Sequence, residues 1–452
     1  MIRFQRAYLP VLAAPLAIGL LAIATMFGGA SRLDILPPLA VRIAGIAVIA
    51  WIIWTAAPST LARERTVPLI WAAMFAVPLA QLVPLPWTVW TTLPGHQLAR
   101  DVNMALGLAP WHAISLTPDR TFNGLLALIP AFAAWLIARR LDENGRKAML
   151  SAIALLTLAS AVVGLMQRAA GSTSNLYFYA VTNETSSVGF FSNANHHAVF
   201  LCCGLIAVLG WLAQQVRRKK RGAPLDGMLA LGAMAVIGAS IIATESRAGV
   251  MLAPLALLFG MTLLPFHMLG IGPRTVRIGS LLVVGTGALA ATLLIGGFLG
   301  DFGVSNGISD DSRLANLPIF VRIATDNLPF GAGMGSFDPV FRGYEETKTL
   351  NFSYLNNAHN DYAQIAIEAG LAGIGLVLIF LIWFFRRLFR QVVRGLPRSG
   401  SERMQWAGAG MVLLMLIHSV VDYPLRTAAL SVLFGICCAF LSPPLVPSGE
   451  QG

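Results

Sequence analysis

Residues 148–166 read AMLSAIALLTLASAVVGLM, nineteen residues without a charge, and this stretch decides the fold class. A transmembrane α-helix needs about 20 consecutive apolar residues to cross the hydrocarbon core of a bilayer. The stretch lacks the alternation of apolar and polar residues that a strand of a membrane β-barrel shows. Because a backbone in lipid must satisfy its hydrogen bonds internally, this run predicts a membrane-spanning helix.

The composition of the whole chain supports the same fold class. Its 452 residues are 56% hydrophobic and only 12% charged, about half the charged fraction of a soluble domain. The net charge of +11 comes from short bursts of Lys and Arg between apolar runs, which argues against nucleic-acid binding. Two adjacent cysteine pairs, 202–203 and 437–438, lie inside apolar runs without metal-ligand spacing, so we interpret them as small hydrophobic residues.

Similar apolar runs recur along the chain and predict an all-α polytopic membrane protein with about twelve transmembrane helices, forming one integral membrane domain over residues 1–452. The predicted spans are 8–30, 37–57, 67–84, 121–138, 148–166, 197–216, 227–244, 248–269, 279–299, 362–385, 406–421 and 427–441. The first lacks a clear cleavage site before a soluble domain, and more spans follow it. We therefore interpret it as a retained span rather than a signal peptide.

The distribution of basic residues predicts the orientation of these spans. If the N-terminus is cytoplasmic, the loops on its side hold 21 of the 32 Lys and Arg residues, and the opposite loops hold 10. Basic residues concentrate in cytoplasmic loops. The sequence therefore predicts that both termini are cytoplasmic.

Three segments on the opposite side, 85–120, 167–196 and 300–361, are longer than simple connectors need to be. The third is a large loop between the ninth and tenth spans. Trp87, Trp90 and Trp111 in the first segment suit a stretch that lies on the bilayer surface, because tryptophan favours the membrane interface. The candidate chemistry of the chain gathers on this side.

Arginines supply the first candidate site residues. Arg247, in ATESRAGVMLAPL, lies where one apolar run ends and the next begins. It could snorkel to lipid phosphates, or it could face a cavity as a fixed cation that binds a phosphate or diphosphate. In the large loop, Arg313 and Arg322 flank an amphipathic stretch, and GAGMGSF follows at 331–337. That glycine-rich run lacks the Lys-Ser/Thr of a P-loop, so a tight turn that permits close helix approach is favoured.

The end of the large loop supplies a candidate base. His359, Asn360 and Asp361 directly precede the span predicted at 362–385. Histidine transfers protons near neutral pH, whereas Asn360 or Asp361 could simply cap the helix. Because His359 ends the longest polar loop, on the predicted side of the arginines, we favour a functional role for it.

Two weaker groups of polar residues remain. In GFFSNANHHAVF, His196 and His197 are adjacent and do not share a helix face, which argues against a two-histidine metal site. In HSVVDYPLRTAAL, His418 and Asp422 are four apart and could hydrogen-bond, while Asp422 and Arg426 could form a structural ion pair. No carboxylate pair or D-x-D pattern suggests a metal-dependent sugar-nucleotide transferase. We therefore predict neither a metal nor a cofactor.

Three motifs in one order resemble the O-antigen ligase and polysaccharide polymerase family of bacterial inner-membrane glycosyltransferases. They are SRAG at 246–249, the run R-x8-R-x6-PFGAGMGSF that begins at Arg313, and AHNDYAQ followed by E-x-G-L-x-G at 358–373. The resemblance covers roughly residues 185–385 and extends more loosely to PLPWTVWTTLPGH, SLTPD and HSVVDYPLRT. It implies a GT-C-like protein of about twelve helices with a large periplasmic loop, which takes glycan from an undecaprenyl-diphosphate carrier without a metal.

The resemblance also implies roles for particular residues. Arg247 and Arg313 would bind the carrier diphosphate, and His359 would deprotonate the acceptor hydroxyl. Many members read N-R-N-H where this chain reads NANH at 193–196, so the role of that arginine is absent here or passes to another one. The candidate substrate-binding residues are Arg322, Asn360, Asp361, Asn195, His196, Arg168 and Arg426.

Several activities stay open at this point. A ligase would join the finished glycan to lipid A core, whereas a polymerase would join it to another carrier-linked repeat unit, with a chain-length regulator as a further partner. The NANHHA and DYPLRT stretches resemble exopolysaccharide-type polymerases more closely, so we favour a polymerase of O-antigen or exopolysaccharide repeat units. A flippase or transporter of lipid-linked oligosaccharides is the alternative from another class. Transporters usually place polar residues at mid-membrane in repeated halves, and neither feature is visible here.

Overall fold

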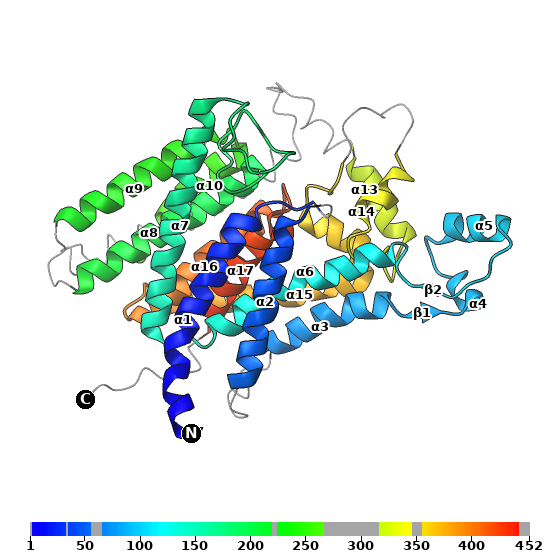
Figure 1. Ribbon diagram of the computed structural model, residues 1–452, viewed down its shortest axis with the longest axis horizontal. Coiled ribbons are helices and arrows are strands. Elements are labelled where there is room, and N and C mark those ends of the chain that lie inside the picture. The colour runs from blue at the N-terminus through cyan, green and yellow to red at the C-terminus, as the bar shows by residue number, and fades with distance from the viewer. Residues whose placement is uncertain are drawn as a thin grey trace.

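The computed structural model describes residues 2–32, 35–55, 66–218, 224–265, 316–345 and 355–442, which form an almost wholly helical molecule (Figure 1). The strands β1 (Pro84–Leu85) and β2 (His112–Ala113) pair antiparallel. Among the described residues, six helices are long and apolar enough to cross a membrane. They are α2 (Pro37–Thr55), α6 (Pro118–Ala138), α7 (Glu143–Ala170), α8 (Ala194–Arg218), α9 (Pro224–Ala243) and α15 (Asp361–Arg394).

The remaining helices are shorter or less apolar. Four contain shorter apolar stretches: α1 (Ile2–Phe27), α3 (Thr66–Gln81), α10 (Arg247–Met261) and α17 (Ala428–Phe440). The others are α4 (Trp87–Trp90), α5 (Gln97–Ala105), α13 (Leu317–Asp326), α14 (Phe337–Arg342), α16 (Gly400–His418) and the 3₁₀ helix η2 (Pro424–Arg426). This content confirms an all-α polytopic membrane protein.

Eleven of the twelve predicted spans coincide with a helix of the structure. The predicted span 279–299, the first part of the large loop and Arg313 lie outside the described residues. The total of twelve spans therefore stays a prediction. The largest difference in length concerns α15, which begins one residue before the predicted span and ends nine residues after it.

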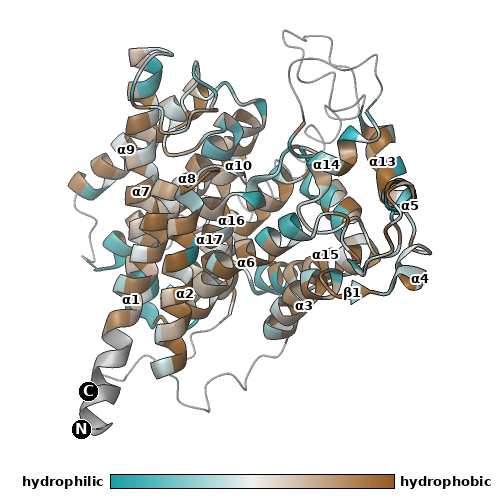
Figure 2. Cartoon of the chain, turned by 45° about the vertical axis from the view of Figure 1, so that its right-hand side comes forward, coloured by the Kyte–Doolittle hydropathy of each residue, from teal (hydrophilic) through white to brown (hydrophobic). Residues whose placement is uncertain are grey.

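Helix α8 forms the centre of the bundle, and most of its side chains are buried. It packs against α7, α9, α10 and α16. A Cβ atom at Gly249 would lie only 2.4 Å from the Cβ of Ala198, so the glycine of SRAG allows α10 to approach α8. The outer helices α2 and α9 instead expose apolar side chains such as Ile53 and Leu231, as lipid-facing helices do. Figure 2 shows hydrophobic residues over these helices.

Buried arginines stabilise the ends of several helices. Arg146 donates to Ser442 O at 2.7 Å, just beyond α17, and Arg403 donates to Leu263 O at 2.9 Å, just beyond α10. The last carbonyl groups of a helix have no partner within it and carry partial negative charge, so a cation there is favourable. Part of the basic charge that we used to predict orientation therefore also has a structural role.

Helix α15 is interrupted at Gly370, whose φ of 55° and ψ of −142° are not helical. The residues around the break pair with the glycine-rich turn. Leu371 N donates to Pro329 O at 2.9 Å, and Gly333 N donates to Glu368 O at 3.0 Å. The GAGMGSF run is thus a tight turn that permits close approach to a helix, as the sequence predicted.

Two further contacts hold this turn in place. The amide of Gln81, at the end of α3, donates to Phe330 O and Glu368 O, and its oxygen accepts from Met334 N. A small apolar core joins α13 and α14 to α15; its largest members are Phe320, Ile323, Phe337, Phe341 and Ile367. The described end of the large loop is therefore packed firmly against the first half of α15.

We expect Gly370→Ala to destabilise the protein by about 1–3 kcal/mol, because a side chain is strained at positive φ. Its Cβ would also lie 2.3 Å from Pro329 O. Gly375→Ala is the matched control, since it lies in the same helix with nothing within 4 Å of the added atom. Thermal unfolding of purified protein in detergent measures both. Equal unfolding temperatures for the two variants would contradict this account of the break.

Candidate functional site

A buried carboxylate, Asp422, lies in the turn between α16 and α17 and contacts polar side chains from α8 and from the start of α15. Asn195 Nδ2 donates to Asp422 Oδ2 at 2.8 Å. On the other oxygen, His359 Nδ1 lies 3.2 Å and His196 Nε2 3.8 Å from Oδ1. We call these four residues the Asp422 cluster. The cluster brings together residues from three distant segments of the sequence, each of which we had singled out separately.

The charge of Asp422 depends on its histidine neighbours. Burial raises the pKa of this carboxyl, but the neighbouring imidazoles of His196 and His359 outweigh burial and hold the pKa well below its ordinary range. Asp422 is therefore an anion at neutral pH. A buried anion facing Nδ1 favours the tautomer of His359 that carries its proton on Nδ1.

The backbone and the neighbouring rings fix His359 further. Its φ is +48°, an uncommon value for a residue with a side chain, and such strain is typical of functional positions. Asn360 caps α15 by accepting from Ala363 N at 2.9 Å. The rings of His359 and His196 both pack edge-on against Tyr423, with centroids 4.8 and 4.9 Å from it. Since Nδ1 faces Asp422, Nε2 is the nitrogen of His359 that can take a proton.

A second buried network supports the cluster from behind. Arg426 Nη1 lies 2.9 Å from Glu368 Oε2, and its Nε lies 3.6 Å from Asp361 Oδ1. Ser419 Oγ donates to Asp361 Oδ2 at 2.9 Å, and Gln364 donates to Glu368 Oε1 at 3.0 Å. The ion pair that we considered between Asp422 and Arg426 is thus replaced by pairs to α15. Glu368 has no exposed side-chain surface, so Arg426 neutralises a fully buried charge.

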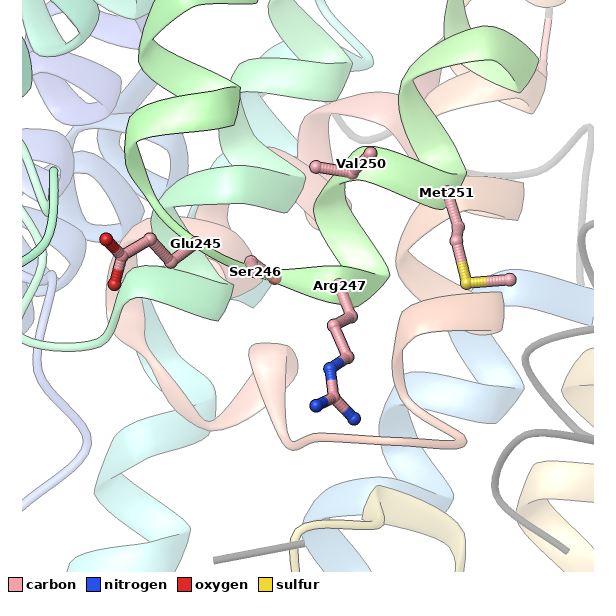
Figure 3. A pocket seen from close by; sticks show the side chains of 5 residues that line it. All are labelled: Glu245, Ser246, Arg247, Val250 and Met251. Carbon is pink, nitrogen blue, oxygen red and sulfur yellow. The ribbon is translucent and has the colours of Figure 1, made fainter. Parts of the chain in front are cut away.

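Arg247 occupies the first turn of α10, after a capping serine. Ser246 Oγ accepts from Gly249 N at 3.1 Å, which explains the Ser and Gly of SRAG. Arg247 is exposed and lines a shallow hollow of about 400 Å³. Figure 3 shows its side chain extending away from α10, in a different direction from Glu245. The hollow is lined by Glu245, Ser246, Arg247, Val250 and Met251.

The other candidate arginines lie apart from the Asp422 cluster in the described ranges. Arg168 donates to Glu245 Oε1 at 2.7 Å and to Thr185 O, which places it beside the hollow of Arg247. Arg322 is 75% exposed; it lies 3.9 Å from Asp326 and 5.7 Å from the ring of Tyr344. Neither is among the partners of Asp422. The structure therefore gives no support to placing Arg322 near His359.

Sequence analysis missed the roles of several buried polar residues. Glu368 belongs to the E-x-G-L-x-G motif but received no role of its own. A carboxylate inside an apolar span is costly and usually functional or paired, and Asp361 and Glu368 stand seven residues apart on one helix face. That spacing is a signal that could have identified both as partners of one cation. Tyr423 and Ser419 carried no comparable signal.

Within the described ranges, no group of three or more His, Cys, Asp and Glu side chains could hold a metal ion. Metal independence stays a prediction.

Fold and site together define a multi-pass α-helical membrane protein with a histidine–aspartate pair at one end of its helices. Residues 232–378 match the family model described as O-antigen ligase. This match confirms the resemblance that the three motifs predicted. The matched range contains Arg247, Arg313 and His359, whereas Asp422 lies beyond it. A search of curated proteins found no match.

We expect Arg426→Ala to destabilise the protein by about 3–5 kcal/mol, because it leaves the buried charge of Glu368 without a partner. The double variant Arg426→Leu/Glu368→Met should recover most of this loss, since it removes both charges. Arg322→Ala is the matched control and should cost at most about 1 kcal/mol, because its ion pair is exposed. Unfolding temperatures in detergent distinguish these cases. Wild-type stability of Arg426→Ala would show that the pair does not hold α15 in place.

Proposed function

We propose that the protein is a glycosyltransferase that acts on the periplasmic face of the bacterial inner membrane. It takes glycan from an undecaprenyl-diphosphate carrier and transfers it to a sugar hydroxyl, thereby polymerising O-antigen or exopolysaccharide repeat units. The observation that carries this proposal is the contact of His359 Nδ1 with buried Asp422 at 3.2 Å. The O-antigen ligase domain at 232–378 supplies the class of reaction.

In the proposed reaction, His359 Nε2 takes the proton of the acceptor hydroxyl. Asp422 holds the ring through Nδ1 and stabilises the imidazolium that forms. The acceptor oxygen bonds to the anomeric carbon of the donor as the bond from that carbon to the carrier diphosphate breaks. The released diphosphate carries the negative charge, and Arg247 and Arg313 stabilise it through guanidinium groups that match its oxygens.

The proposed orientation has both termini in the cytoplasm and the Asp422 cluster at the periplasmic side. The excess of Lys and Arg in the loops on the N-terminal side supports it. Asp422 follows α16, and His359 precedes α15, so the cluster lies at the end of these helices that faces the predicted periplasmic loops.

A ligase that transfers glycan to lipid A core is the second candidate, favoured by the description of the matched family model. Deletion of the gene followed by glycan electrophoresis separates the two. Single repeat units on lipid A, or loss of secreted polymer with normal lipopolysaccharide, would indicate a polymerase. Lipid A core without any added glycan would indicate a ligase. If the protein is a polymerase, a chain-length regulator would be a further partner.

A flippase is the rival from another class. Purified protein in vesicles should lengthen carrier-linked glycan if the proposal is correct. Movement of labelled lipid-linked sugar across the vesicle membrane without longer products would favour the flippase.

We expect His359→Ala to lower glycan transfer by about 10²–10⁴-fold, the usual contribution of a general base. Asp422→Asn should lower turnover with little change in KM, because it disturbs the ring of the base rather than substrate binding. His112→Ala, a half-buried histidine in β2, is the control. Transfer assays with purified protein in vesicles measure all three. Near-normal transfer by His359→Ala would reject the mechanism.

Arg247→Ala should abolish polymer formation while membrane insertion stays intact, because the departing diphosphate loses a cation. Arg100→Ala removes another partly exposed arginine, one paired with Asp101 on α5, and should leave polymer length unchanged. Glycan electrophoresis of complemented deletion strains compares them. Polymer of normal length with Arg247→Ala would exclude this residue from the site.

We expect EDTA to leave glycan transfer unchanged, because guanidinium groups rather than a metal ion would stabilise the leaving diphosphate. The same vesicle assay, with and without chelator, tests this. Strong inhibition that added divalent cation reverses would identify a metal site that the proposal lacks.

A further inference from the structure

The segment that runs from β1 through α4 and α5 to β2 projects from one end of the molecule. It connects α3, which ends at Gln81, to α6, which begins at Pro118, and these two apolar helices pack against each other. In Figure 1 the segment lies beyond the ends of α3 and α6, at the right of the view. The chain therefore leaves the helical bundle and returns to it at the same end, beside the expected membrane boundary.

Helix α5 presents an apolar face that the described part of the protein does not cover. None of its residues is buried. Leu98, Val102 and Leu106 are 72%, 52% and 66% exposed, and their spacing of four residues places them on one face of the helix. Arg100 lies on the opposite face beside Met104, which is 59% exposed, and Asn103 lies at the edge of that face. The apolar surface continues after the helix with Leu108 and Trp111, which are 50% and 66% exposed, respectively.

The base of α5 is held firmly, so its exposed face has a defined direction. Trp90 Nε1 donates to Ala113 O at 2.8 Å and its ring stacks on His112 with centroids 4.4 Å apart. His96, directly before α5, is buried against the carbonyl groups of Pro94 and Ile114. This scaffold of aromatic rings and hydrogen bonds orients α5 without covering its apolar side.

We propose that α5, together with Leu108 and Trp111, lies in the membrane interface with Leu98, Val102 and Leu106 inserted among the lipid chains. The occupant of the apolar face is the lipid surface, because the segment joins two apolar helices, α3 and the candidate membrane span α6. An amphipathic helix with tryptophan beside it is the usual form of an interfacial anchor.

Charge and size favour lipid over other occupants. Arg100 and Asp101 pair with each other at 3.1 Å, so the helix carries no net charge that would select a charged partner. A stable protein interface buries roughly 1,200–2,000 Å² in total, more than one face of a nine-residue helix supplies. A second copy of the chain is therefore a poorer fit.

This anchor would also reach the described end of the large loop. A Cβ atom at Gly95 would lie 2.0 Å from Asn327 Oδ1, so the residues before α5 lie directly against the end of α13. Interfacial insertion of α5 would therefore fix the height of α13 relative to the bilayer.

Site-directed spin labelling tests the proposal on the full-length protein in lipid nanodiscs. The four native cysteines are buried, so single cysteines introduced by Leu98→Cys and Val102→Cys would carry the label. Arg100→Cys and Asn103→Cys are the matched controls on the opposite face of the same helix. We expect labels at 98 and 102 to be several-fold more accessible to oxygen than to a water-soluble nickel chelate. Labels at 100 and 103 should show the reverse.

Two outcomes would overturn the proposal. Equal access of the nickel chelate to all four positions would show that α5 projects into water. Spin–spin broadening between labels at 98 in separate copies would show that a second chain covers the face. All four positions are partly or largely exposed, so the variants should fold; gel filtration and the wild-type unfolding temperature check this.

Discussion

The buried ion pair between Arg426 and Glu368 is the interaction on which the candidate site depends. It connects the second turn of α15 to the turn between α16 and α17, two segments that are far apart in sequence. Burying two charges is costly unless geometry and further hydrogen bonds compensate. Gln364 donates to Glu368, and Asp361, which accepts from Ser419, lies 3.6 Å from Arg426. The pair therefore sets the register between α15 and the turn, and this register brings His359 to Asp422.

Backbone strain coincides with the two motifs at the site. In the described ranges, the residues other than glycine with positive φ are Glu245 and His359. Glu245 directly precedes the SRAG motif, and His359 belongs to AHNDYAQ. Strain of this kind persists only where the surroundings determine the conformation. Here the surroundings include two helix caps. Ser246, before Arg247, and Asn360, after His359, each accept a backbone hydrogen bond that fixes the local conformation.

Local chemistry made much of the structure predictable from sequence. Apolar runs gave the helices, and the glycines at 331–335 predicted the turn that meets the break in α15. That Arg426 is the cation shared by Asp361 and Glu368 was not predictable in this way, because Glu368 lies 58 residues before it and sequence spacing does not say which distant residue pairs with it. Arg322 was predicted to bind substrate from its place in the R-x8-R run, and in the structure it lies at the surface beside Tyr344. The sequence around an arginine of this kind carries no signal that separates substrate binding from a surface contact.

The two halves of the proposed site differ in exposure, and the chemistry gives a reason. A general base acts over a few tenths of an ångström, so it needs one fixed geometry. The imidazole of His359 has such a fixed geometry, because the anion of Asp422, the ring of Tyr423 and the helix cap at Asn360 all constrain it. A carrier diphosphate arrives along the membrane and must leave again. Arg247, an exposed cation on a rigid helix start beside an open hollow, can meet such a group without first breaking a buried network.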